Sequence, residues 1–86
     1  MKIAANTRAI MKYANFIGFK KVRQRGTHMI LKDQLNNTVT LKRHANKKTF
    51  SQYHLKELLH DLGSNFDEYI QYLNIKSTEY QKRESA

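Results

Sequence analysis

The sequence contains no cysteine, so neither a disulfide framework nor a thiolate metal site can hold the fold together. With 86 residues and 40% hydrophobic content, it supports one small domain with a modest apolar core. No stretch approaches the roughly 20 apolar residues that span a bilayer. Asn6, Thr7 and Arg8 interrupt the apolar residues near the N-terminus, unlike a signal peptide. We therefore expect a cytoplasmic protein that makes no membrane contact.

Acidic residues are nearly absent from the first part of the chain. Residues 1–56 carry 13 Lys and Arg residues against Asp33 alone, whereas residues 57–86 carry three against six Asp and Glu. Carboxylates hold the cations of two-metal nucleases, so this chemistry is disfavoured, and we expect no metal and no small-molecule cofactor. A positive field confined to one part of a small domain attracts polyanions, which favours nucleic acid as a partner.

Local signals predict one helix and three strands in the basic part. Asn6 is a candidate helix N-cap, Gly18 a helix stop, and Gly26 the centre of a tight hairpin turn. Alternating residues within the strands place His28 on one face and Met29 on the other. The predicted elements are a helix over 7–17 and strands over 19–25, 27–33 and 38–42.

Two further helices are predicted after a basic loop at 43–48. Thr49 with Gln52 forms one candidate capping box, and Ser64 with Asp67 forms another. Each is followed by apolar residues at helical spacing: Leu55, Leu58, Leu59 and Leu62, which Gly63 ends, and then Phe66, Tyr69, Ile70 and Leu73. The second set predicts a short helix over about 65–74.

These elements define an α+β domain over residues 1–75, in the order α-β-β-β-α with an additional short C-terminal helix. The polar tail 76–86 has no apolar pattern, so we expect it to lack regular structure. Two amphipathic helices can cover one face of a three-stranded sheet and leave the other face open to solvent.

Histidine is the candidate catalytic residue type. RNA can be cleaved without metal when a base removes the 2′-hydroxyl proton and cations stabilise the developing charge. Histidine, with an ordinary pKa of about 6.5, suits this task at neutral pH. His60 lies on the leucine helix as a surface residue, and His54 lies at its start as a surface or capping residue. His44 lies in the basic loop, and His28 follows a Gly-Thr turn among basic residues. Spacing alone also allows a structural role for His28.

The run GFKKVRQRGTHMILK, residues 18–32, resembles the core signature of the HicA (YcfA-like) toxins, in which Gly-Ser/Thr-His follows a basic strand. VTLKRHANK also resembles the family's His-x-x-Lys pattern through His44 and Lys47, although the family commonly has proline at the position of Lys42. The resemblance covers about residues 6–73. It implies a fold similar to a double-stranded-RNA-binding domain, a catalytic His28 that cleaves mRNA, and a HicB-like antitoxin as protein partner.

The same interpretation assigns RNA contacts to the basic residues of the strands and the loop. Arg23, Arg25 or Lys48 would stabilise the charge of the transition state. The expected RNA-binding residues are Lys20, Lys21, Arg23, Arg25, Lys32, Lys42, Arg43, His44, Lys47 and Lys48.

Two alternatives belong to other functional classes. A non-catalytic module would bind double-stranded RNA through shape and phosphate contacts and would not cleave it. A DNA-binding protein would place the leucine helix in a major groove. That helix carries Lys56 beside Glu57 and Asp61, a poor composition for phosphate contact, so this alternative is the least favoured.

Overall fold

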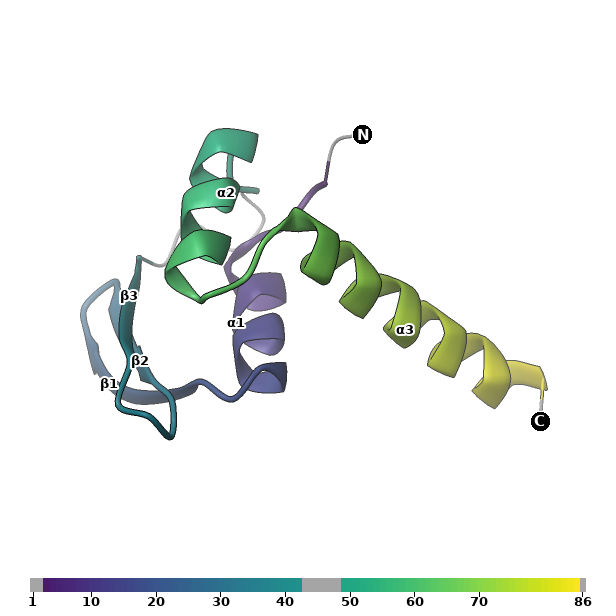
Figure 1. Ribbon diagram of the computed structural model, residues 1–86, viewed down its shortest axis with the longest axis horizontal. Coiled ribbons are helices and arrows are strands. Elements are labelled where there is room, and N and C mark those ends of the chain that lie inside the picture. Colours follow the sequence, from purple (N-terminus) through teal and green to yellow (C-terminus); the bar gives the residue numbers. More distant parts are fainter. Residues whose placement is uncertain (1–2, 43–48, 86) are drawn as a thin grey trace.

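In a computed structural model that describes residues 3–42 and 49–85, one sheet and three helices follow the predicted order (Figure 1). The elements are α1 (Thr7–Phe16), β1 (Lys20–Arg25), β2 (His28–Lys32), β3 (Thr38–Lys42), α2 (Gln52–Asp61) and α3 (Phe66–Ser85). The sheet is antiparallel throughout, with strand order β1-β2-β3. The predicted α+β class and α-β-β-β-α order with an additional C-terminal helix are confirmed.

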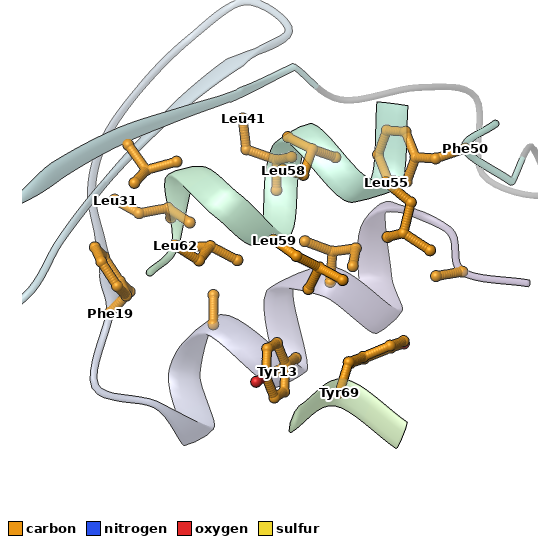
Figure 2. Close-up of a cluster of buried hydrophobic side chains, with 14 of the residues drawn as sticks. Tyr13, Phe19, Leu31, Leu41, Phe50, Leu55, Leu58, Leu59, Leu62 and Tyr69 are labelled. Atoms are coloured by element: carbon orange, nitrogen blue, oxygen red, sulfur yellow. The ribbon is translucent and has the colours of Figure 1, made fainter. Parts of the chain in front are cut away.

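The hydrophobic core lies on one side of the sheet. α1 and α2 both lie against this side, whereas α3 extends away from the sheet (Figure 1). Figure 2 shows Leu62, the residue after α2, next to Leu31 of the sheet, Leu58 of α2 next to Leu41, and Leu59 between α2 and α1. All of these leucines are buried. The opposite face of the sheet is therefore left without a covering helix from the described residues.

Caps fix both ends of α1, as the sequence predicts. The Asn6 side chain accepts a hydrogen bond from the Ala9 backbone N–H at 2.9 Å. At the other end, Gly18 has a φ of +107°, and the backbone N–H of Phe19 donates to the Ala14 carbonyl at 2.9 Å. Phe19 is buried, so this turn directs the chain from α1 into β1.

The N-cap of α2 is Ser51, and the predicted Thr49–Gln52 capping box was wrong. The Ser51 hydroxyl accepts from the His54 backbone N–H at 3.2 Å. Thr49 instead pairs with Asn6 in an isolated antiparallel bridge. The Gln52 amide joins the start of α2 to the N-terminal segment, because it accepts from the Ile3 N–H at 3.2 Å and donates to the Ile3 carbonyl at 2.6 Å.

The N-cap of α3 lies one residue later than predicted. The Asn65 side chain accepts from the Glu68 backbone N–H at 2.9 Å, which is the capping contact that the sequence assigned to Ser64. Ser64 has a tertiary role instead. Its hydroxyl donates to the Glu68 carboxylate at 3.0 Å and hydrogen bonds with the Tyr13 hydroxyl, which links α3 to α1.

Tyrosines attach α3 to α1. The ring of Tyr13 meets Tyr69 and Tyr72 edge to face, at centroid distances of 5.0 and 5.1 Å. Burial raises the pKa of the Tyr69 hydroxyl, as expected for a group whose charged form is disfavoured in the core. Tyr72 was absent from the predicted apolar stripe, and Leu73, which was in it, is 39% exposed.

α3 continues to Ser85, so the expectation that residues 76–86 lack regular structure was wrong for residues 76–85. This stretch contains neither glycine nor proline, and Lys, Arg, Glu and Gln favour helix. A helix that is already nucleated adds further residues at low cost, even without an apolar stripe. The additional C-terminal helix is therefore long rather than short.

Asp33 organises the turn between β2 and β3. Its carboxylate accepts from the backbone N–H groups of Leu35 at 3.0 Å and Asn37 at 2.8 Å, and from the Asn37 side-chain amide at 2.9 Å. The hydrogen bond from the Asn37 side chain is the main cause that lowers the pKa of Asp33. Because the pKa of Asp33 is lowered in the folded state, the ionised carboxylate stabilises the fold at pH values above the ordinary pKa of aspartate.

We expect Asp33→Ala to lower the melting temperature at pH 7. The difference in melting temperature from wild type should shrink as the pH falls below 3.8, the ordinary pKa of this carboxyl. The stabilisation is lost as the pH falls through the folded-state pKa. Thermal unfolding followed by circular dichroism at several pH values measures this difference. Gln34→Ala, in the same turn, is the control. A difference that stays constant down to pH 2 would contradict the role of the carboxylate.

Candidate functional site

The uncovered face of the sheet is defined by the strand register. Side chains alternate along β2, and Met29 and Leu31 are buried, so His28, Ile30 and Lys32 face outward. Directly opposed residues of neighbouring antiparallel strands lie on the same face. The pairing extends each of these into a row across all three strands. The rows, together called the open face here, are Arg25–His28–Lys42, Arg23–Ile30–Thr40 and Lys20–Lys32–Thr38.

The open face is strongly basic. Its five cations are exposed: Lys20, Arg23, Arg25, Lys32 and Lys42. None of its nine residues carries a carboxylate. Asp33, which follows β2, directs its carboxylate into the adjacent turn. With no acidic group to offset these cations, the face concentrates positive potential over one side of a thin sheet, which suits a phosphate backbone.

A β-bulge brings Lys20 to the open face. The register shifts between Lys21 and Arg23, and Val22 is the extra residue, 59% exposed. Without the bulge, residues 20 and 23 would lie on opposite faces, because side chains alternate along a strand. The bulge therefore adds a cation to the basic face, and no local sequence signal indicated it.

Lys21, by contrast, is placed apart from the other predicted contacts. Lys21 pairs with the buried Leu31, so it lies on the sheet face that the helices cover. It is nevertheless exposed, because β1 is the edge strand. Its ammonium donates to the Gln24 side-chain oxygen at 2.8 Å, and Gln24 pairs with Met29 on the same face. The structure thus brings together five of the six predicted strand cations.

His28 lies at the head of the central strand, between Arg25 and Lys42. The hairpin that carries it turns through Gly26 and Thr27, and Gly26 has a φ of +60° that glycine adopts without steric cost. The imidazole is exposed and is flanked by one cation on each neighbouring strand. A histidine, a guanidinium and an ammonium are thus presented together to solvent.

The other histidines are placed differently. His54 is half-buried at the start of α2, with its ring 5.2 Å from that of Phe50, and His60 is exposed on α2, away from the open face. His44 lies outside the described residues, as do Arg43, Lys47 and Lys48. Among the described histidines, only His28 belongs to the basic face.

Within residues 3–42 and 49–85, no three His, Asp or Glu side chains gather as potential metal ligands. No helix in the same ranges combines the length and apolarity needed to cross a membrane.

The fold and the site together define a small α+β domain that presents a histidine on a basic, helix-free sheet face. The family model described as "HicA toxin of bacterial toxin-antitoxin" matches residues 8–64, about two thirds of the chain. The chain belongs to this family, and it is therefore the toxin of a toxin–antitoxin system with a cognate antitoxin. The family is known for RNase-like toxins. No curated protein and no solved structure matches the chain.

If the open face binds nucleic acid, Arg23→Gln should weaken binding to an RNA duplex and lower the slope of log K against log salt by about 1. Titrations at several salt concentrations would measure this slope, in a His28→Ala background that prevents cleavage. Lys56→Gln, which removes an exposed cation of α2, is the matched control and should leave the slope unchanged. Equal slopes for all proteins would contradict the assignment of this face.

Proposed function

We propose that the protein is a metal-independent endoribonuclease that cleaves mRNA in the cytoplasm, with His28 as its catalytic residue. The observation that carries this proposal is the position of His28 on the open face, exposed and flanked by Arg25 and Lys42. Family membership supports the RNase activity. The absence of carboxylates from the open face supports catalysis without a divalent cation, because hard cations require oxygen ligands.

The reaction proceeds by attack of the RNA on itself. The neutral imidazole of His28 takes the proton of a 2′-hydroxyl, and the 2′-oxygen forms a bond to the adjacent phosphorus. The bond from phosphorus to the 5′-oxygen breaks, and this oxygen takes a proton from water. The products are a 2′,3′-cyclic phosphate, which can open to a 3′-phosphate, and a 5′-hydroxyl. The imidazolium then returns its proton to solvent.

The remaining cations of the open face bind the substrate. Lys20, Arg23 and Lys32 lie one and two rows from His28, all on the same side of it, so they contact phosphates that neighbour the scissile one on that side. A basic sheet face reads no base sequence by itself, because phosphate contacts position the RNA and carry no sequence information. Arg43, His44, Lys47 and Lys48 extend the basic sequence beyond β3 and complete the proposed RNA-binding set.

The cognate antitoxin is proposed to be HicB-like and to cover the open face. A nuclease that acts on cellular mRNA harms its own host unless it is held inactive. Acidic groups on the antitoxin would complement the exposed cations, which speeds association and blocks RNA from reaching His28.

Expression of wild-type protein without its antitoxin is expected to stop growth, and His28→Ala is expected to abolish this effect. The loss of one general base reduces the rate by about 10²–10⁴-fold. Growth curves after induction measure toxicity. Because His28 is exposed, the variant should retain the melting temperature of wild type.

His60→Ala is the matched control, since it removes an exposed histidine of α2 and should remain toxic. Full toxicity of a folded His28→Ala protein would rule out the proposed role of this residue.

A further inference from the structure

The register places Lys42 directly opposite His28, at the end of β3. Opposed residues of an antiparallel pair have Cβ atoms about 4.5–5.5 Å apart and project to the same side of the sheet. Both side chains are exposed, so both can reach a phosphate that lies over the first row of the open face. Lys42 is the cation that β3 contributes to this face.

Arg25 occupies the equivalent position on the other side of His28. The central strand thus holds the candidate base between a guanidinium on β1 and an ammonium on β3. A scissile phosphate must lie close to His28 if its neighbouring 2′-hydroxyl is to reach the imidazole. The two flanking cations are then the open-face charges nearest to that phosphate, since the other cations lie in the next two rows.

We propose that Lys42 is a second catalytic residue, whose ammonium stabilises the charge that develops on the non-bridging oxygens of the scissile phosphate. This inference rests on the proposed nuclease function and extends it. As the 2′-oxygen bonds to phosphorus, negative charge builds on these oxygens before the bond to the 5′-oxygen breaks. A cation fixed beside them binds the transition state more strongly than the ground state, so it raises the rate of the chemical step.

The role of Lys42 differs from that of the remaining cations. Lys32 lies two rows away from His28, where it can hold a neighbouring phosphate but cannot reach the reacting one. Removal of Lys32 should therefore weaken binding of substrate, whereas removal of Lys42 should slow the reaction of substrate already bound.

The test compares kcat and KM for cleavage of one defined RNA in the presence of EDTA. Lys42→Gln is expected to lower kcat at least tenfold with little change in KM, and Lys42→Arg, which keeps the charge, is expected to restore most of kcat. Lys32→Gln should raise KM, and Lys56→Gln on α2 should match wild type. Melting temperatures of all variants show whether each is folded.

The outcomes separate this inference from the function on which it rests. If wild type cleaves the RNA and Lys42→Gln raises KM without lowering kcat, Lys42 only anchors the substrate and the inference fails alone. If Lys42→Arg is as slow as Lys42→Gln, charge is not the cause, and the inference also fails. If wild type leaves the RNA intact, the proposed function itself is wrong and the inference falls with it.

Discussion

The alternation of side chains along β2 is the constraint on which the rest of the molecule depends. Burial of Met29 and Leu31 beneath the helices obliges His28 and its outward neighbours to face solvent. A shift of register by one residue would bury the histidine and expose the core. The apolar packing that stabilises the fold therefore also places His28 on the solvent side of the sheet. Because Arg25 and Lys42 pair with His28 on the flanking strands, they lie on the same side.

The local order of the chain could be predicted because its signals are local. Asn6 and Gly18 bound α1 through contacts within a few residues, and the alternation of β2 placed His28 correctly from the sequence. The capping residues of α2 and α3 were missed because competing contacts are tertiary. Thr49 pairs with Asn6, and the Ser64 hydroxyl hydrogen bonds with the Tyr13 hydroxyl. Contacts with residues far away in the sequence therefore decide which side chains cap α2 and α3.

The candidate site was predictable in its residues but not in its arrangement. The sequence pointed to His28 and to a basic surface, yet it did not indicate that Lys42 lies beside the histidine, because register depends on the pairing of three strands. The bulge at Val22 is a second case. The bulge brings Lys20 to the open face and leaves Lys21 on the other face. Nothing in the sequence around Lys20 and Lys21 distinguishes this bulged strand from a regular basic strand. The length of α3 was missed because a polar stretch without apolar periodicity can still continue a helix.

α3 follows the segment that the family model matches, which ends at residue 64. Tyr69 and Tyr72 attach its first turns to Tyr13 of α1, on the far side of the helices from the open face. The helix therefore adds to the core without obstructing the basic face.

We propose that His28 on the open face cleaves RNA without metal. The most direct measurement is incubation of purified wild-type and His28→Ala proteins with total cellular RNA in EDTA, followed by mapping of the fragment ends. We expect cleavage by wild type only, with cyclic-phosphate or 3′-phosphate ends. Binding of RNA without cleavage by either protein would contradict it and would identify the domain as an RNA-binding module in which the histidine has no catalytic role.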